Sequence, residues 1–292
     1  MRCISHKKKI ITAETQSFLF SVCSKTIFCS CLIFLFALAP MLNGAYPKAA
    51  IPYTTEAPSR PCAFQALSPY YVQQETDSSC SLATVTMVVN ALRSRITPHF
   101  TPSSQQEVLS RVHDRTWTKA VAQGGMGVSL DQCARILKKV LRVYGLHKIH
   151  VDVTHVLHLA SSKGELNKAL HKLASTKKLG TLLIANFDQS VLIPVGEPVG
   201  HFSPLGEYIA DSKQVLVMDV DKDWTGPYWV SRAKLLKSLH TISTDNRTYR
   251  GYITITVLPA TARGSGKYPL ALPLSSTGLT DMCEEKGISS QR

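Results

Sequence analysis

The chain has 292 residues, of which 44% are hydrophobic, and it carries a formal net charge of +13. This length can hold one large or two small domains, and the hydrophobic fraction is ordinary for a globular core. The basic residues are scattered, and their longest run is the three lysines at 7–9. The charge therefore argues against nucleic-acid binding and favours attraction of an anionic small substrate.

The first 45 residues have the pattern of an export signal. Lysines at 7–9 and Lys25 precede an apolar run over 26–40, and small residues follow at 43–45. This order is typical of a signal peptide, and the run of about 15 residues is short for a membrane span of roughly 20. An uncleaved N-terminal anchor is the alternative. We expect a periplasmic, secreted or anchored protein, whose net charge is +9 once residues 1–45 are removed.

Four of the eight cysteines lie in that segment, and the others are Cys62, Cys80, Cys133 and Cys283. These four show no C-x-x-C pair and no metal-ligand spacing, so we predict no metal site. In an oxidising compartment Cys62 could form a disulfide with Cys133 or with Cys283. The sequence leaves this pairing open.

A cysteine opens the first predicted helix. Residues 46–67 are rich in Pro, Ala and Thr and are expected to be a lead-in. The helix should run from Cys80 to about Arg95, because the residue before Pro98 disfavours α conformation. Its apolar residues recur at three- and four-residue steps: Leu82, Val85, Val89 and Leu92. At this N-terminus the helix dipole favours a thiolate; a small buried core residue is the alternative interpretation.

The next predicted elements are also helical. A short helix is expected over 104–112, followed by a glycine-rich turn at 123–127. Ser129 and Gln132 form a capping-box pattern that opens a further helix, which ends near Gly145. Cys133 lies on the apolar face of that helix, so we interpret it as a core residue.

The second half of the chain is dominated by strand patterns. Strands are predicted at 149–153, 181–187, 201–208, 214–220 and 251–257, and helices at 163–176 and 231–240. The last strand should close the sheet, and residues 259–292 are expected to form a flexible tail. Together these patterns predict one α+β domain over 68–258 with a mainly antiparallel sheet.

Two residues could complete a nucleophilic site with Cys80. His201 opens the strand after a Pro/Gly-rich turn, and Asp219 stands at the end of the next strand. Adjacent antiparallel strands would bring the two side by side. A carboxylate at the end of an apolar strand is costly without a partner, and an imidazolium is a suitable one. A cysteine nucleophile needs such a base and an acceptor that orients it.

Several motifs in this order resemble the phytochelatin synthase family, in its short bacterial form. They are Gln74-x5-Cys80 with the helix LATVTMVVNAL, then GVSLDQ, GHFSP, and Asp-Val followed by an aromatic-Pro loop ending in Trp-Val. The resemblance spans roughly residues 68–257. It implies the fold of the papain-like cysteine peptidase clan, with the nucleophile at the N-terminus of a core helix packed on a mainly antiparallel sheet.

The resemblance also implies roles for individual residues. Cys80 would be the nucleophile, His201 the base and Asp219 the residue that orients His201. Gln74 would donate its amide to the oxyanion beside the Cys80 backbone N–H. Lys222 stands where the family usually has Arg, and could hold a substrate carboxylate without the bidentate fork.

Other positions depart from the family pattern. Ser81 replaces the usual Gly, Thr76 stands where many members have an acidic residue, and Thr225 stands where an aromatic is common. Ser81, Thr76 and Lys222 are therefore predicted substrate-pocket residues. The Cys-rich C-terminal half of the plant and yeast enzymes has no counterpart here.

The reaction implied is acyl transfer from glutathione. Cleavage of its Cys–Gly bond would release glycine and leave a γ-glutamylcysteinyl thioester on Cys80. Water would then give γ-glutamylcysteine, and a second glutathione would give phytochelatin. No cofactor is required by this scheme, and cadmium or zinc would enter as the metal-thiolate form of the substrate. Glutathione and related γ-glutamyl thiols are the expected partners, with a homodimer left open.

Two alternatives remain. Processing peptidases that remove bacteriocin leaders share the Gln-x5-Cys, Gly-His-Phe and Asp pattern, but they are normally joined to a transporter. A binding module on the same fold, without turnover, is the second, and the altered loop before Cys80 motivates it.

Overall fold

Six strands form one antiparallel sheet, which is the framework of the part that the structure describes. The computed structural model describes residues 61–97, 99–193, 197–221, 223, 226–243 and 247–258. The strands are β1 (Ile149–His155), β2 (Thr181–Asp188), β3 (Gly200–Ile209), β4 (Gln214–Val217), β5 (Tyr228–Ser231) and β6 (Gly251–Val257). Their order is β1-β6-β2-β3-β4-β5, and each neighbouring pair is antiparallel.

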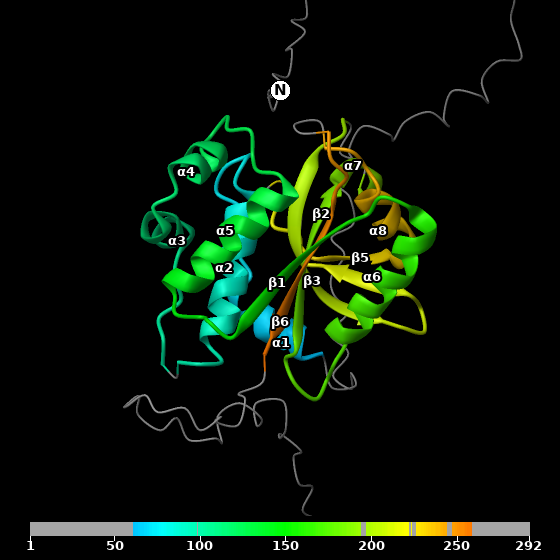
Figure 1. Ribbon diagram of the computed structural model, residues 1–292, viewed down its shortest axis with the longest axis horizontal. Coiled ribbons are helices and arrows are strands. Elements are labelled where there is room, and N and C mark those ends of the chain that lie inside the picture. Colours follow the sequence, from blue (N-terminus) through cyan, green and yellow to red (C-terminus); the bar gives the residue numbers. More distant parts are fainter. Residues whose placement is uncertain are drawn as a thin grey trace, which may run out of the picture. The chain divides into compact units, whose positions relative to one another are not determined.

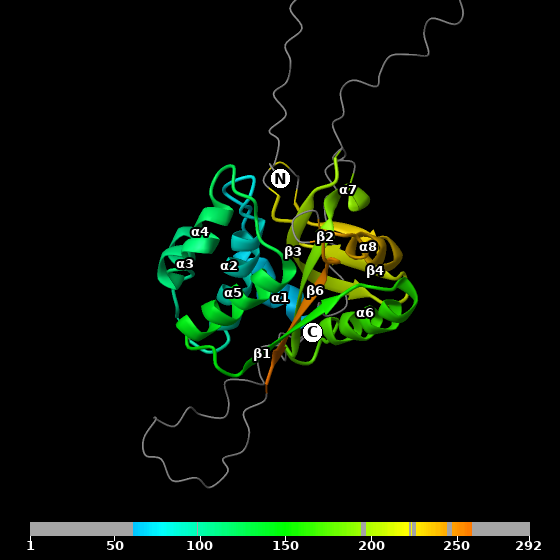
Figure 2. The same cartoon turned by 45° about the horizontal axis from the view of Figure 1, so that its top comes forward.

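Helices cover both faces of this sheet. They are α1 (Cys62–Leu67), α2 (Cys80–Arg93), α3 (Gln105–Val112), α4 (Arg115–Val121), α5 (Leu130–Val143), α6 (Leu159–Leu173), α7 (Gln189–Leu192) and α8 (Arg232–Leu239). In Figure 1, α2 to α5 lie on one side of the strands and α6 and α8 on the other, and Figure 2 shows the same separation. The eight residues of β2 are all buried, as a central strand covered on both faces requires.

Helix α2 packs against the central strands and is almost entirely buried. All its residues except Arg93 are buried, including its polar ones. The Thr84 hydroxyl donates to the Phe202 carbonyl at 3.1 Å, which fixes α2 against β3. The helix ends within two residues of the predicted position. Its N-terminal residue, Cys80, is therefore held at a defined place beside the sheet.

Most predicted elements are confirmed. The sheet with packed helices agrees with an α+β domain, and α3, α5, α8 and the predicted strands are present. The capping box forms in full: Ser129 Oγ accepts from the Gln132 backbone N–H, and the Gln132 side chain accepts from the Ser129 N–H. Cys133 is buried on the apolar face of α5.

Some predictions differ from the structure. The strand β6 lies between β1 and β2, so it is an interior strand and does not close the sheet at an edge. The strand β4 ends at Val217, two residues before Asp219, so the predicted strand over 214–220 is longer than the observed one. The helix α6 begins at Leu159 and ends at Leu173, several residues before both predicted bounds. The short elements α4, α7 and β5 were not predicted, because four to seven residues carry too little periodicity.

The N-terminal boundary also differs from the expected lead-in. Helix α1 falls within the segment 46–67, and its residues pack into the core. Cys62 is disulfide-bonded, whereas Cys80 and Cys133 are free thiols, so the option of a Cys62–Cys133 pair is wrong. The predicted signal or anchor at 1–45, the tail at 259–292 and Cys283 lie outside the described residues. Within those residues, no helix combines the length and apolar character needed to cross a membrane.

Candidate active site

The thiol of Cys80 lies at the first residue of α2. The helix begins there because Ser79 leaves helical geometry, while its carbonyl accepts from the N–H groups of Leu82 and Ala83. Backbone N–H groups in the first turn of a helix have no partner within the helix. The Cys80 sulfur therefore stands beside a set of backbone donors and the positive end of a fourteen-residue helix.

His201 and Asp219 form a buried pair. The His201 Nε2 atom lies 2.7 Å from Asp219 Oδ1, and the two residues are 3% and 0% exposed. His201 is on β3, and Asp219 follows β4, its antiparallel neighbour. The two strands bring together residues that are 18 positions apart in the chain. This is the arrangement expected from the sequence.

The environment of His201 favours the imidazolium. Burial by itself would lower its pKa, but the adjacent Asp219 carboxylate and its hydrogen bond hold the pKa well above the usual value. A hydrogen bond with the Cys80 side chain adds to this effect. Because Nε2 faces Asp219, Nδ1 is the nitrogen left for the thiol. The Phe187 ring packs edge-on against the imidazole at 5.5 Å and restricts its orientation.

The Asp219 carboxylate is held by several donors. Its Oδ1 accepts from the Asp221 backbone N–H at 2.9 Å and from the Ser203 hydroxyl at 3.4 Å, besides His201. Burial would raise the pKa of Asp219, but the His201 charge and these donors lower it. The Tyr71 hydroxyl donates to the Asp219 backbone carbonyl, which fixes the turn after β4. The carboxylate is thus kept ionised in a solvent-free position.

Gln74 lies next to this turn. Its backbone N–H donates to the Val220 carbonyl at 2.7 Å, so the loop before α2 is attached to the residue after Asp219. The Gln74 side chain is buried, and its Oε1 atom has no hydrogen-bond partner among the described residues. Such an atom is costly to bury unless another group binds near it. The loop therefore presents a buried amide close to the Cys80–His201–Asp219 group.

Two of the three predicted pocket residues, Ser81 and Thr76, lie in the part of the chain that the structure describes. Ser81 is buried, and its hydroxyl accepts from the Trp117 indole N–H at 3.2 Å. The Thr76 hydroxyl donates to the Val121 carbonyl at 2.7 Å. Both hydroxyls are therefore engaged within the protein, and their contact with substrate stays a prediction. Lys222 and Thr225 lie outside the described residues.

Arg250 is a neighbour of the site that the sequence interpretation missed. It is buried and precedes β6, and its guanidinium donates to the Thr241 hydroxyl and the Ile242 carbonyl. A Cβ atom on Gly200 would lie 2.9 Å from its Nη2 atom, so a side chain at this position would require the end of Arg250 to shift. In the sequence, a single arginine directly before an apolar strand could have indicated this buried residue.

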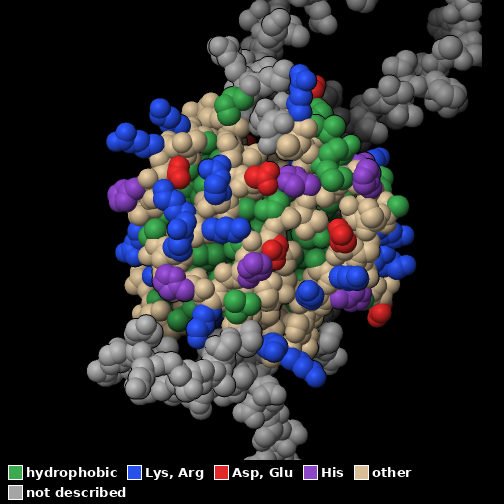
Figure 3. Space-filling view, viewed as in Figure 1, with side chains coloured by type: hydrophobic (Ala, Val, Ile, Leu, Met, Phe, Trp, Pro, Cys, Tyr) green, Lys and Arg blue, Asp and Glu red, His purple; other side chains and the backbone are tan. Residues whose placement is uncertain are grey.

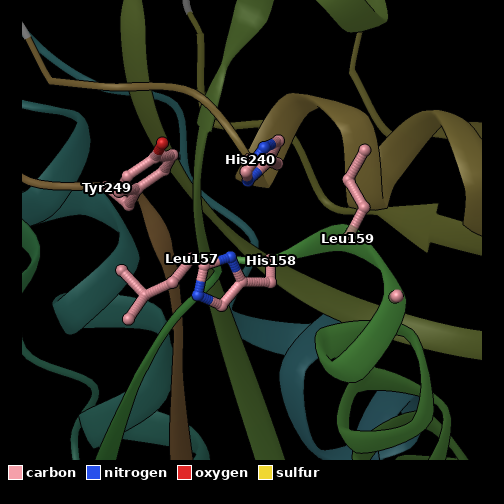
Figure 4. A pocket seen from close by; sticks show the side chains of 6 residues that line it. Leu157, His158, Leu159, His240 and Tyr249 are labelled. Atoms are coloured by element: carbon pink, nitrogen blue, oxygen red, sulfur yellow. The ribbon is translucent and has the colours of Figure 1, made fainter.

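Two pockets lie away from this group. One, of about 550 Å³, is lined by residues at the start of α6 together with His240 and Tyr249, whose rings stack at 5.0 Å (Figure 4). The second, of about 600 Å³, continues between α6 and α8. None of the lining residues belongs to the Cys80 site. Neither pocket is lined by a cysteine, serine, threonine or carboxylate side chain.

Surface charge and possible metal ligands are two further properties that bear on ligand binding. Figure 3 shows basic side chains on both sides of the visible face with acidic ones between them, which agrees with scattered lysines and arginines. Among the described residues, no group of three or more His, Cys, Asp or Glu side chains is arranged to hold a metal ion.

The geometry is that of one class of site: the Cys80 thiol at a helix N-terminus is hydrogen-bonded to the buried His201 imidazole, and the Asp219 carboxylate binds the other side of that ring. Comparison with known proteins then places the chain. The family described as phytochelatin synthase matches residues 54–252, so the chain belongs to the phytochelatin synthase family.

Individual proteins are also similar to this chain. Glutathione gamma-glutamylcysteinyltransferase 3 from Lotus japonicus is 28% identical over 200 residues, covering 67% of this chain and 38% of the relative. Glutathione gamma-glutamylcysteinyltransferase 1 from Triticum aestivum is 26% identical over 203 residues, covering 66% of this chain and 35% of the relative. The chain thus spans less than two fifths of the length of these relatives.

Proposed function

We propose that this protein is a cysteine acyltransferase or hydrolase of the phytochelatin synthase type, which cleaves the Cys–Gly bond of glutathione. The observation that carries the proposal is the buried His201–Asp219 pair, 2.7 Å apart, with its remaining ring nitrogen directed to the Cys80 thiol. Membership of the family and the names of the relatives support glutathione as the substrate. The helix-first order followed by an antiparallel sheet is compatible with the papain-like fold.

Acylation begins from the Cys80 thiolate beside the His201 imidazolium, which already holds the proton of the thiol. The thiolate sulfur attacks the carbonyl carbon of the Cys–Gly peptide bond, and the carbonyl oxygen becomes an oxyanion. The Cys80 backbone N–H and the Gln74 amide stabilise that oxyanion. The C–N bond then breaks, the His201 imidazolium gives its proton to the leaving amine, and free glycine departs. A γ-glutamylcysteinyl thioester remains on Cys80.

Deacylation follows the reverse sequence with a new nucleophile. His201 takes a proton from water or from the amino group of a second glutathione, which attacks the thioester carbon. The S–C bond breaks, the Cys80 sulfur leaves as a thiolate, and His201 keeps the proton taken from the nucleophile, which restores the starting pair. Water gives γ-glutamylcysteine, and glutathione gives phytochelatin. Asp219 keeps the imidazole in one orientation and stabilises its charge in both halves.

The substrate would be drawn in by charge. Glutathione is anionic, and the chain is strongly basic. Lys222 is proposed to hold a substrate carboxylate, with Ser81 and Thr76 in the wall of the donor pocket. The protein needs no cofactor in this scheme, and cadmium or zinc enters bound to the substrate thiolate.

Mass spectrometry of the purified chain with glutathione, with and without cadmium, tests the proposal. We expect free glycine and γ-glutamylcysteine, plus phytochelatin if a second glutathione is an efficient acceptor. Cys80→Ala is the matched control and should give neither product. If no glycine is released while Cys80 still reacts with iodoacetamide, the substrate is another peptide, as in the processing peptidases. If Cys80 is also inert, the protein is a binding module.

A further inference from the structure

Tyr228 lies on the same side of the sheet as the Asp219 carboxylate. It is the first residue of β5 and pairs with Val217 of β4. The chain continues along β3 beyond Val217, because the Met218 N–H donates to the Pro204 carbonyl at 2.9 Å. Side chains two positions apart along such a segment point to the same face, so Val217 and Asp219 are expected to share a side. Diagonal neighbours on adjacent strands are within reach of an aromatic side chain. The Tyr228 hydroxyl is thereby directed to the carboxylate that orients His201.

One oxygen of Asp219 is well supplied with donors and the other is not. Oδ1 receives hydrogen bonds from His201, from the Asp221 N–H and from the Ser203 hydroxyl. Oδ2 is buried and makes no hydrogen bond of standard geometry with a described residue. A buried carboxylate oxygen without a donor is costly, so a nearby hydroxyl group is expected to serve it.

Tyr228 is suited to that task. Only 7% of its surface is exposed, so its hydroxyl cannot rely on bulk water. A hydrogen bond between its side chain and Asp219 is among the causes that lower the pKa of the carboxyl group. Burial first, and then the Asp219 charge, raise the pKa of Tyr228, so the phenol keeps its proton and can donate it. Hydrogen bonds in unliganded sites are often long and tighten when substrate binds.

We propose that Tyr228 is a positioning residue, which donates its hydroxyl proton to Oδ2 of Asp219 and so keeps Oδ1 aimed at His201. This role rests on the proposed function, because it acts through the orientation of the catalytic base. The carboxylate then has a donor on each oxygen and cannot rotate away from the imidazole. Tyr228 does not touch the reacting atoms.

Four other titratable groups face this carboxylate or its neighbours. His201 approaches from β3, and Cys80 approaches His201 from α2. Tyr71, from the loop before α2, donates to the Asp219 backbone carbonyl and therefore does not replace Tyr228. Asp221 is close enough to raise the pKa of both tyrosines. Because His201 and Asp219 are hydrogen-bonded to each other, a change that acts on the carboxylate is measured as a change of the pair.

Tyr228→Phe removes the hydroxyl and keeps the ring. Without it the Asp219 carboxylate binds a proton more readily, so the acid limb of the pH–rate profile should move to higher pH by about half a unit to one unit. The rate constant at neutral pH should fall about tenfold, the effect of losing one hydrogen bond to a charged group. The KM for glutathione should stay within about twofold, because Tyr228 does not contact substrate.

The test compares wild type, Tyr228→Phe and Tyr208→Phe as full-length chains. Tyr208 is a matched control, because it is also buried in the sheet but its hydroxyl binds Asn167 and Arg232. The rate of iodoacetamide alkylation at Cys80 is measured by peptide mass spectrometry between pH 4 and 8, with glutathione turnover beside it. A shifted acid limb in Tyr228→Phe alone, with a thermal midpoint near that of Tyr208→Phe, supports the proposal.

A double mutant separates a positioning role from a structural one. In an Asp219→Asn background, Tyr228→Phe should have no further effect on alkylation or turnover. An equal loss in both backgrounds overturns the proposal, as does a Tyr228→Phe profile that coincides with wild type while Cys80 is reactive. If wild-type Cys80 reacts no faster than a free thiol, the proposed function fails as well.

Discussion

His201 Nε2 lies 2.7 Å from Asp219 Oδ1, and both side chains are removed from solvent. Two ionisable groups this close and this buried stabilise each other's charged form. The pKa of His201 is raised by the Asp219 charge against the opposing effect of burial, and the pKa of Asp219 is lowered by His201. The pair therefore stays ionised over a wide pH range and fixes the position of the His201 ring.

Replacing Asp219 by Asn should nearly abolish turnover. The side chain keeps its shape, but His201 loses the charge that holds its tautomer, so kcat should fall by about 10³- to 10⁴-fold. Steady-state kinetics of glycine release measure this, with Asp211→Asn as a control because Asp211 is an exposed carboxylate in the turn between β3 and β4. Wild-type activity in Asp219→Asn would remove this residue from the mechanism.

The same pair predicts a pH window for stability. Asp219 has a lowered pKa in the folded protein, so its contribution is present above its unfolded value of about 3.9 and is lost as the pH falls through the folded value. His201 has a raised pKa, so its contribution is complete below about 6.5 and is lost as the pH rises through the folded value.

Wild type should therefore exceed Asp219→Asn in stability most clearly between about pH 4 and 6.5. We expect a difference of about 1 to 3 kcal/mol there, as for a hydrogen bond between charged groups. Urea unfolding of both proteins at several pH values measures it. A difference that does not change with pH would show that the pair does not ionise as described.

The sequence predicted the elements that carry a strong local signal. The periodic apolar residues of α2, the capping box at Ser129 and the alternation of β6 are all found as expected. His201 and Asp219 could be placed together because two strands joined by a short turn are expected to pair antiparallel, which brings the start of the first strand beside the end of the second. The strand β6 was expected to close the sheet, and its position between β1 and β2 could not be predicted, because it depends on pairs more than about 60 residues apart in the chain.

The surroundings of the site could not be predicted in the same way. Ser81 was predicted as a pocket residue because it stands where the family usually has Gly, but its hydroxyl accepts from Trp117 of a short helix that the sequence pattern did not indicate. Tyr228 lies near Asp219 from β5, and the Arg250 guanidinium lies near Gly200 from the residue before β6. Their roles depend on side-chain direction and strand register, neither of which leaves a local pattern.

Gln74→Ala tests the proposed oxyanion donor. Removing one such donor should lower kcat by about 10²-fold with little change in KM, because the contact forms only as the oxyanion develops. The alkylation rate of Cys80 should stay near that of wild type, since Gln74 does not act on the thiol. Gln65→Ala, at an exposed position in α1, is the control. An equal loss of alkylation and turnover would show instead that Gln74 supports the loop.

Ser81→Ala distinguishes a structural serine from a substrate contact. The change leaves the buried Trp117 indole N–H without its acceptor, so the free energy of unfolding should fall by about 1 to 3 kcal/mol. If the hydroxyl serves only Trp117, the KM for glutathione should be unchanged. Thermal unfolding and steady-state kinetics on the same preparation measure both. A raised KM with unchanged stability would restore the interpretation of Ser81 as a pocket residue.

Gly251→Ala should destabilise the sheet strongly. Gly251 begins β6 and pairs with His155 at the end of β1. A Cβ atom there would lie 1.9 Å from the Thr154 carbonyl oxygen, which is backbone and cannot rotate aside, so the two strands must separate. We expect a loss of more than about 2 kcal/mol. Gly164→Ala is the matched control, because Gly164 lies within α6 with open space around it, and alanine there should stabilise by roughly 0.5–1 kcal/mol. Chemical unfolding of the two variants measures the contrast, and similar stabilities would mean that the β1–β6 register differs from the one described.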